Sequence, residues 1–323
     1  MTKLIATHSG SFHADDVFGV AVLAAMFPDN RIVRTRDAGE IAKADFAVDV
    51  GGSWDAAQGR FDHHQRGFDG ARVDAQGARA EGYASAGLVW REYGRDYVRQ
   101  VAQGMGRELS EAEAKQVAGD VDTSLVRYLD LVDTGAANVA PGVFGLSSQV
   151  ALLNSNWLEE QDLDAVAQAS LQLQRFDEAR AMVRRHLDRF VLKTIGQLLA
   201  ADKVRQAPRL FDDRVLVLED GGMPWTRVVV DEMPQVLLVA YPDSEGGRWQ
   251  VRTVPKEQAS FDSRLDLPEA WAGLRDAELA AASGVPDAAF CHLNLFIAVA
   301  RSKPGALRLA ELALATPPST GAA

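Results

Sequence analysis

The stretch KLIATHSGSFHADD, residues 3–16, decides the fold of the N-terminal half of the chain. Residues 3–7 form a short apolar run that ends at a turn rich in Gly and Ser, which predicts a buried strand entering a loop. Residues 15–27 carry apolar side chains at helical spacing behind an acidic first turn, and Pro28 follows. We therefore expect a strand, a polar loop and a helix in this order, the first part of a βαβ unit.

The same alternation continues along the chain. Strand-like runs cover residues 31–35 and 44–50, and the pattern turns helical over 85–97 and 110–132. Strands that alternate with helices build parallel sheets. We therefore expect an α/β fold with a mainly parallel sheet in the N-terminal domain.

The second half of the chain predicts a separate domain. Residues 162–201 contain no Gly or Pro before Gly196, which predicts one or two helices that bridge two domains. We place the boundary near residue 200, with one domain and its helical linker over 1–200 and a smaller α/β domain over 201–323. The later periodicity predicts strands at 215–218, 236–241, 249–254 and 289–300, and helices at 274–282 and 304–315.

Composition limits the class of protein and the kind of metal site. With 323 residues, 47% hydrophobic and 24% charged, the chain has the composition of a globular protein, which excludes a disordered, collagen-like or coiled-coil chain. The single cysteine, Cys291, excludes a disulfide framework and every thiolate zinc site. Any metal must therefore bind to histidine and carboxylate. Four of the six histidines lie within the first 64 residues.

The net charge of the chain limits the kinds of molecule that the protein can bind. The net charge is −11 and the isoelectric point is about 5.1, which argues against long duplex DNA held by a basic face. A short anionic substrate stays compatible, because bound cations neutralise phosphates locally. No run approaches the roughly 20 apolar residues of a membrane span, and the N-terminus lacks the apolar run of a signal peptide. We expect a cytoplasmic protein with no membrane partner.

Two groups of polar residues follow predicted strands. His8, His13, Asp15 and Asp16 lie on the loop after the first strand and on the start of the helix, and Asp49 interrupts the end of the strand at 44–50. In an open α/β sheet, ligands bind outside the carboxyl ends of the strands, so these side chains can converge on a metal. The alternatives are that Asp15 or Asp16 only caps the helix beside surface histidines, and that Asp49 is a solvated turn residue.

Two further groups can complete such a site. In Asp62-His63-His64 the adjacent histidines of an extended segment face opposite sides, so one can bind metal while the other faces substrate, and Asp62 can orient a ring. Asp130 and Asp133 share a helical face, and either can supply a further carboxylate. We prefer Asp133, because Thr134-Gly135 is typical of a helix end. The alternatives are a polar loop and ordinary exposed acids.

Together these residues suit divalent cations and phosphate chemistry. Manganese and magnesium take oxygen and imidazole ligands, and two ions about 3.5–4 Å apart stabilise the attacking and leaving oxygens of a phosphoryl displacement. We expect two divalent cations, Mn²⁺ first and Mg²⁺ as the alternative, with a bridging hydroxide as the nucleophile. The expected ligands are His8, His13, Asp15, Asp49, His63 and Asp133.

The motifs carry a family resemblance that runs essentially end to end. Asp62-His63-His64, with the acid at the strand end and the N-terminal His/Asp cluster, resembles the DHH phosphoesterase superfamily. The chain is more similar to the Myg (melanocyte-proliferating-gene) family of metal-dependent hydrolases, whose eukaryotic members have reported exonuclease activity on RNA. The motifs that carry this second resemblance include THSGSFHADD at 7–16, VDVGG at 48–52, FDHHQRGF at 61–68, GGMPW at 221–225 and WQVRTVPK at 249–256.

The resemblance implies a role for each matching residue. It makes His8, His13 and Asp15 terminal metal ligands, Asp49 the bridging ligand, and His63 a further ligand, with His64 in contact with substrate phosphate. One departure concerns His13, which occupies the first acidic position of an Asp-x-Asp pair found in most DHH enzymes. Asp16 is therefore a substitute ligand on that side.

In the C-terminal half the resemblance implies a substrate domain that closes over the metals. Lys256 and Arg264 are the expected phosphate contacts, with solvated surface cations as the alternative. His292 is a further substrate-side residue. Related proteins have glycines after the corresponding histidine, whereas this chain has Leu-Asn-Leu, so we expect altered binding there.

These inferences predict an enzyme, a metal-dependent phosphoesterase that acts as a 3'-5' exonuclease on short or single-stranded RNA. The first alternative is a small-molecule phosphohydrolase, either a pyrophosphatase or a cyclic-dinucleotide phosphodiesterase, which the acidic charge and the missing glycines favour. The second is a metal-binding regulatory protein without turnover. The expected partner is RNA or a small phosphorylated substrate. The oligomeric state stays open, and a homo-oligomer is one of the alternatives.

Overall fold

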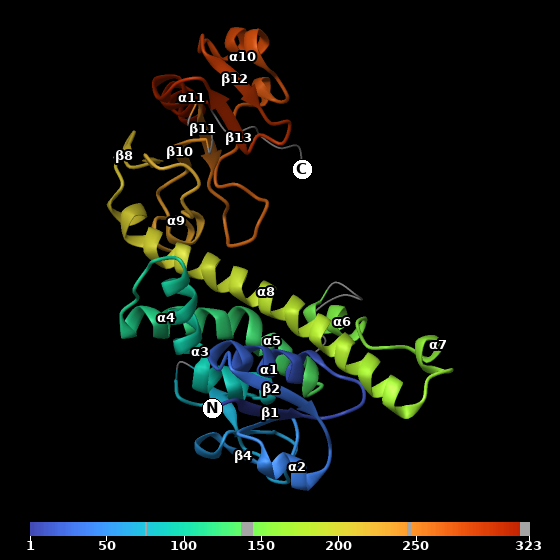
Figure 1. Cartoon of the computed structure of the whole chain (residues 1–323). Coiled ribbons are helices and arrows are strands. Elements are labelled where there is room, and N and C mark those ends of the chain that lie inside the picture. Colours follow the sequence, from blue (N-terminus) through green and yellow to red (C-terminus); the bar gives the residue numbers. More distant parts are fainter. Residues whose placement is uncertain (75, 137–144, 244–246, 317–323) are drawn as a thin grey trace. The chain divides into compact units, whose positions relative to one another are not determined.

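A computed structural model describes residues 1–74, 76–136, 145–243 and 247–316 (Figure 1). The chain divides into two compact units, residues 1–195 and 196–323. The division falls inside α8 (Ala165–Gln206), so the predicted bridging segment is one continuous helix. None of the helices in the described part of the chain is both long and apolar enough to cross a membrane.

The first unit contains a five-stranded sheet of order β2-β1-β3-β5-β4. Its pairs are parallel except for β4 with β5, at one edge of the sheet. The predicted α/β fold with a mainly parallel sheet in the N-terminal half is therefore confirmed. The strands are β1 (Lys3–Thr7), β2 (Asn30–Arg34), β3 (Phe46–Val48), β4 (Trp54–Asp55) and β5 (Arg60–Phe61), and a separate hairpin pairs β6 (Ala71–Val73) with β7 (Arg79–Gly82).

Helices pack on both faces of this sheet. On one face α1 (Ala14–Met26) approaches β3 closely, because Gly19 lets Val48 come nearer than any side chain at that position would allow. The preceding residue of β3, Ala47, points to the opposite face and packs with Ile41 of α2 (Ala38–Lys43). The alternation of the strand thus separates two helical layers. Further helical elements of this unit are α3 (Ser85–Gly104), α6 (Leu146–Ala151), α7 (Trp157–Glu160) and a short 3₁₀ turn at Ala56–Gln58.

The segment predicted to be helical over 110–132 is continuously helical from residue 111 to residue 133, but it is not one regular α-helix. It consists of α4 (Glu111–Val121), a π-helical turn (Asp122–Val126) and α5 (Arg127–Asp133). A π turn adds a residue to the helical repeat and rotates the side chains that follow it about the axis. The side chains of Asp130 and Asp133 therefore point in other directions than they would on an unbroken α-helix that starts at residue 110.

The second unit has a six-stranded sheet of order β12-β13-β11-β10-β9-β8. Only β9 with β10 is parallel among its pairs. One face packs against a core that includes Leu279 and Leu309, and the other against a core that includes Val204 and Val229. The elements are β8 (Arg209–Leu210), β9 (Val215–Val217), α9 (Thr226–Glu232), β10 (Leu238–Pro242), β11 (Trp249–Thr253), a 3₁₀ turn (Glu269–Trp271), α10 (Asp276–Ser283), β12 (Ala288–Cys291), β13 (Ile297–Ala300) and α11 (Lys303–Ala315).

The single strand expected at 289–300 is wrong. The segment forms β12 and β13, an antiparallel pair joined by a turn in which Leu295 has φ 58°. The turn contains neither Gly nor Pro and includes apolar Leu293, Leu295 and Phe296. Asn294 is the one strong turn-forming residue in it, and the surrounding apolar side chains resemble those of a strand.

Candidate metal centre

The ends of three neighbouring parallel strands place histidines and aspartates at one edge of the sheet. The chain leaves β1 at His8, β3 at Asp49 and β5 at Asp62-His63-His64. Asp49 has φ 55°, a left-handed conformation that is costly for a residue with a side chain, and Gly51 and Gly52 after it also have positive φ. Such conformations concentrate at functional sites, where the surrounding structure imposes them.

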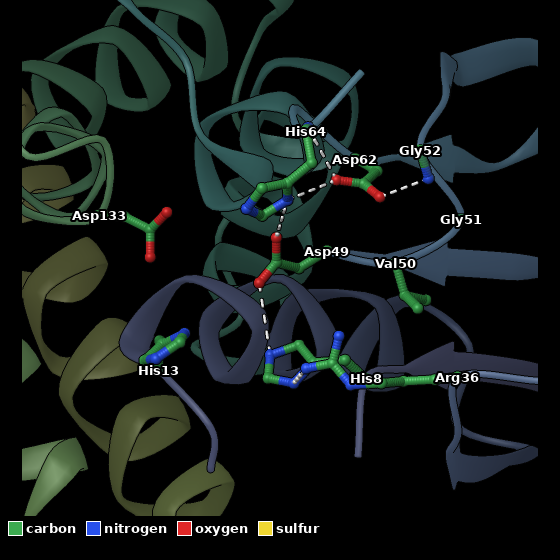
Figure 2. A pocket seen from close by; sticks show the side chains of 10 residues that line it. All are labelled: His8, His13, Arg36, Asp49, Val50, Gly51, Gly52, Asp62, His64 and Asp133. Atoms are coloured by element: carbon green, nitrogen blue, oxygen red, sulfur yellow. Dashed lines mark hydrogen bonds and ion pairs between the residues drawn. The ribbon is translucent and has the colours of Figure 1, made fainter. Parts of the chain in front are cut away.

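Asp49 occupies the middle of the cluster (Figure 2). Its Oδ2 lies 3.4 Å from Nε2 of His8. Its Oδ1 lies 3.2 Å from Nδ1 of His64 and 3.8 Å from Nδ1 of His63. The Ser85 hydroxyl donates to the same Oδ1 at 3.3 Å. The two oxygens of one carboxylate thus face different sets of ligand atoms, which is the arrangement of a bridging ligand.

The ligand atoms form three overlapping groups. Within each group the atoms lie within 4.8 Å of one another. Two groups share no residue and together contain all six of the expected metal ligands. Their members are His8, His13 and Asp49 in one and Asp15, His63 and Asp133 in the other, and the third group contains Asp49, Asp62, His63 and His64.

The first turn of α3 fixes Asp15. This buried carboxylate accepts hydrogen bonds from the backbone N–H groups of Ser85 at 3.0 Å and Ala86 at 2.6 Å. Asp15 therefore caps α3, a helix far from it in sequence, and does not cap its own helix. The partial positive charge at a helix N-terminus stabilises a carboxylate in this position. The bonds also hold the side chain next to His63, whose Nδ1 lies 3.8 Å from Oδ2 of Asp15.

Asp16 caps α1, as one of the alternatives proposed. It accepts from the backbone N–H of His13 at 2.8 Å and from the Thr7 hydroxyl at 3.3 Å. Its Oδ2 also lies 3.4 Å from Nε2 of His8. Asp16 thus positions His8 and the backbone of His13.

The loop before α1 is held from another part of the chain. The Asn154 side chain accepts from the backbone N–H of Phe12 at 2.8 Å and donates to its carbonyl at 3.0 Å. The Arg34 guanidinium donates to the carbonyls of Gly10 and Gln172. These bonds fix the backbone that carries His13, whose own ring is exposed.

Asp133 and Asp130 have different surroundings. Oδ2 of Asp133, the preferred of the two acids, lies 3.3 Å from Nε2 of His63. Asp130 is fully buried, accepts from the backbone N–H of Gly87 at 3.0 Å, and lies 2.7 Å from Nη1 of Arg72. This last contact is an ion pair without the alignment of a hydrogen bond. Asp130 therefore joins α5 to α3 beside the cluster.

Burial and crowding raise the proton affinity of several carboxyl groups. The pKa of Asp15 is raised well above its usual value by burial and by the nearby charges of Asp49 and Asp133. Burial raises the pKa of Asp16 to about 6, although the charge of His8 opposes the shift. Burial also raises the pKa of Asp49, but its contact with His8 and the charges of the neighbouring histidines outweigh this, and the net pKa is lowered. So many buried acids need a compensating positive charge, and a divalent cation supplies one.

The histidines respond in opposite directions. Burial lowers the pKa of His8, but the contact with Asp49 and the negative charges of Asp16 and Asp49 outweigh it, so the net pKa is raised. Burial and the neighbouring His64 lower the pKa of His63. Nε2 of His8 is buried and has no hydrogen-bond partner among the described residues. A buried imidazole nitrogen without a donor is free to bind a metal, so these residues fit divalent cations.

Sequence reasoning missed Arg36, which lines the same cavity. The cavity has a volume of about 470 Å³, and among the described residues that line it Arg36 is the one arginine or lysine. Its Nη2 lies 3.3 Å from Nδ1 of His8, and its Nε donates to the carbonyl of Ser9 at 3.2 Å (Figure 2). Arg36 lies just after the carboxyl end of β2, at the edge of the sheet where His8 and Asp49 also lie. Its position in the sequence could therefore have indicated it. Ser85 was also missed, because no sequence signal near it indicates that the N-terminus of its helix faces the edge of the sheet that carries the cluster.

The expected substrate residues of the C-terminal half lie in the second unit. Lys256 and Arg264 line a common cavity of about 370 Å³. The Arg264 guanidinium donates to the carbonyls of Met233, Val236 and Val230 at 2.7–2.9 Å, so it holds the C-terminal end of α9. This structural role differs from the solvated surface cation of the alternative, and the expected phosphate contact of Arg264 stays a prediction. The phosphate contact of Lys256 stays a prediction.

His292 lies in the turn between β12 and β13. Its Nδ1 accepts from the backbone N–H of Asn294 at 3.0 Å, and its ring packs against Phe296 with centroids 4.4 Å apart. Side chains of Leu293 and Asn294 occupy the positions where glycines were expected in related proteins, and Leu293 is exposed. A substrate role for His292 stays a prediction.

A parallel α/β unit whose strand ends gather histidines and aspartates has the arrangement of a metal-dependent hydrolase. The sequence profile of MYG1_exonuc, described as "Uncharacterised protein family (UPF0160)", matches residues 4–314, and the chain belongs to this family. The predicted resemblance to the Myg family is thereby confirmed. The chain is 33% identical to a MYG1 protein of Caenorhabditis elegans over 97% of this chain and 96% of that protein.

Other relatives bear on activity. The chain is 32% identical to the MYG1 exonuclease of Homo sapiens, over 96% of this chain and 85% of that protein. The expectation of an enzyme with hydrolase or nuclease activity is confirmed by this membership. Among solved structures, RecJ from Thermus thermophilus in complex with Mn²⁺ matches at a TM-score of 0.27 and 18% identity, over 98% of this chain and 53% of RecJ. At that TM-score the match does not establish a shared fold.

Proposed function

We propose that the protein is a metal-dependent phosphoesterase that acts as a 3'-5' exonuclease on short or single-stranded RNA. The observation that carries the proposal is the position of Asp49, whose two oxygens face separate groups of ligand atoms. Membership of a family with named exonucleases supports the same activity.

The two groups that share no residue would hold one divalent cation each. Nitrogen and carboxylate oxygen donors suit Mn²⁺ and Mg²⁺, and Cys291, the one thiol, is buried in the core of the second unit. When bound, such cations supply positive charge to the attacking and leaving oxygens of a phosphoryl displacement. The residues that would hold them are His8, His13 and Asp49, and Asp15, His63 and Asp133.

We assign His64 to the contact with the substrate phosphate. Its Nδ1 lies 2.9 Å from Oδ1 of Asp62, and because a carboxylate can only accept, Nδ1 carries the hydrogen. Asp62 itself accepts from the backbone N–H of Gly52 at 2.6 Å. The ring is therefore fixed, and its Nε2 is left for the substrate. In its doubly protonated form His64 donates from Nε2 to a phosphate oxygen.

Arg36 gives the cavity a second phosphate contact. Its guanidinium is exposed at the cavity and has no ion pair with a carboxylate among the described residues. Two parallel N–H groups of an arginine match two oxygens of a phosphate. We assign Arg36 to the phosphate of the nucleotide in the cavity.

A small-molecule phosphohydrolase is the second candidate. The acidic charge and the leucines after His292 favour a substrate smaller than RNA. The products separate the two functions, because a pyrophosphatase releases orthophosphate from pyrophosphate and an exonuclease releases mononucleotides from RNA.

The test is cleavage of a 5'-labelled oligoribonucleotide in the presence of Mn²⁺. Cleavage from the 3' end gives a ladder of shortened labelled products, whereas cleavage from the 5' end releases the label at once as a mononucleotide. We expect the ladder with the wild-type protein and with Asp162→Ala, an exposed acid outside the cavity, and none with Asp49→Ala. Equal cleavage by Asp49→Ala, or orthophosphate release from pyrophosphate without any RNA product, would contradict the proposal.

A further inference from the structure

One face of α8 carries unpaired positive charge. The basic face consists of Arg185, His186, Arg189, Phe190 and Lys193, which line a surface hollow of about 330 Å³ by themselves. Arg185, Arg189 and Lys193 are exposed, and Phe190 is half-buried. The three cations are four residues apart, so they share one side of the helix.

Ion pairing distinguishes this face from the rest of the helix. Arg175, Arg180 and Arg184 each pair with a nearby carboxylate. No ion pair with Arg185, Arg189 or Lys193 is found among the described residues. The sequence explains the difference, because Asp188 is the one acid between Glu178 and Asp202.

Asp188 is itself engaged elsewhere. It accepts from the Arg184 guanidinium at 2.9 Å and from the Tyr97 hydroxyl at 2.6 Å. In a chain of net charge −11, three exposed cations in a row without carboxylate partners form a local positive patch that can attract an anion.

The spacing suits a chain of phosphates. Four residues of an α-helix rise about 6 Å, so the three cations form a row with a charge at each such interval. An extended single strand presents phosphates at a comparable spacing. Phe190 offers a ring beside the row on which a base can stack. His186 donates from Nδ1 to the carbonyl of Met182 at 2.9 Å, which leaves Nε2 to accept from a ribose hydroxyl.

We propose that the basic face of α8 binds the sugar-phosphate backbone of single-stranded RNA. The choice of RNA rests on the proposed function, but the binding of a single strand can be measured without cleavage. The face would engage only the part of a strand that lies beyond the nucleotides held at the metal centre. Short oligonucleotides would therefore be cleaved without it, and longer ones would gain affinity from it.

The test compares two double charge reversals of equal size. Arg185→Glu with Arg189→Glu removes two cations of the basic face, and Arg107→Glu with Lys115→Glu removes two exposed cations elsewhere in the same unit. Binding of a fluorescein-labelled 20-nucleotide oligouridylate is measured by anisotropy in EDTA over a range of salt concentrations. Arg185→Gln with Arg189→Gln serves if the reversal disturbs folding.

We expect the basic-face variant to bind the 20-mer roughly tenfold more weakly, with a salt slope smaller by about 1.4, from about 0.7 per lost phosphate contact. The control variant should resemble the wild type, and cleavage of a dinucleotide should be the same for all three proteins. Equal loss in both variants, or no loss in either, would overturn the proposal. A change in oligomeric mass of the basic-face variant would also overturn it, because the face would then join two copies of the chain.

The binding test and the proposed function fail separately. If no phosphoester is cleaved but the 20-mer binds in EDTA and depends on the basic face, only the exonuclease proposal is lost. If RNA is cleaved normally and the basic-face variant binds like the wild type, only the present inference is lost.

Discussion

Asp49 holds the left-handed backbone conformation, with φ 55°, that turns its carboxylate between the ligand groups. The neighbouring residues keep it there, because His8 contacts one oxygen and the Ser85 hydroxyl donates to the other. A strained residue persists when its surroundings over-determine its conformation. The geometry of the centre is thus set before any substrate arrives.

Arg36 is expected to act on substrate binding. We expect Arg36→Ala to raise KM for a labelled oligoribonucleotide roughly tenfold, because a charge-assisted contact to phosphate contributes about 1.5–3 kcal/mol. Since the side chain is exposed, the melting temperature should stay within about one or two degrees of the wild type. Arg31→Ala, an exposed arginine of β2, is the matched control. An unchanged KM for Arg36→Ala would show that the guanidinium does not contact substrate.

Asp130 is expected to make the stability depend on pH. Burial raises its pKa to about 7, and Arg72, which also binds Asp122 through two hydrogen bonds, offsets the shift only in part. A carboxyl with a raised pKa in the folded state binds more protons than in the unfolded state. Its contribution is therefore fully present below its unfolded pKa of about 3.9 and is lost as the pH rises through about 7.

The measurement is urea unfolding of the wild type and Asp130→Asn at pH 5 and pH 8, both in EDTA. The wild type should lose stability relative to Asp130→Asn between these two values, because the amide cannot ionise. A stability difference that is the same at pH 5 and pH 8 would show that the pKa of Asp130 is not raised.

At the scale of elements, the strand ends carry the site and the helices hold it. The regular elements were predictable, because the spacing of apolar residues along the sequence indicates which side chains of β1, α1 and β3 are buried. The convergence of His8, Asp49 and His63 followed from the parallel order of the strands. The π turn has no local composition that marks it, and the turn at 292–296 was missed because Asn294 lies among apolar residues typical of a strand.

The hydrogen bonds of Asp15 and Asp130 to α3 were also not predictable from the sequence. Asp15 and Asp130 bond to the first turn of α3 from positions far away along the chain. Such long-range pairings depend on the packing of complete helices, and a single sequence carries no signal for them. For the same reason the sequence could not choose firmly between Asp130 and Asp133.

The close approach of α1 to β3 can be tested by changing Gly19 to Ala. The same change at Gly196, which has no close neighbour, serves as the comparison. A Cβ at Gly19 would lie 2.7 Å from Cγ1 of Val48, so Gly19→Ala should destabilise the protein by about 1–3 kcal/mol. Gly196→Ala on α8 meets nothing within 4 Å and should stabilise it by about 0.4–1 kcal/mol. Denaturant unfolding of both variants checks this. Effects of the same sign would contradict the packing described here.

At the scale of the whole molecule, charge is unevenly distributed. The chain is acidic overall, its buried carboxylates gather at one edge of a sheet, and one face of α8 is basic. Divalent cations would reduce the repulsion among the carboxylates. Such a cation binds only the folded centre, so it adds to the free energy of unfolding.

Metal removal should therefore lower the melting temperature. At a Mn²⁺ concentration about a hundred times the dissociation constant, the expected gain over protein in EDTA is about 2.7 kcal/mol for each bound cation. Asp49→Asn should show little of this gain, and Asp162→Asn should show all of it. Calorimetry with and without Mn²⁺ measures the effect, and an equal gain in both variants would place the metal elsewhere.

The most direct measurement is a crystal structure with Mn²⁺ and an anomalous difference map. We predict two peaks in the first unit, both next to Asp49, one beside His8 and His13 and the other beside His63 and Asp133. A map with no peak at these side chains, or with manganese bound only elsewhere on the chain, would contradict the metal centre and the function built on it.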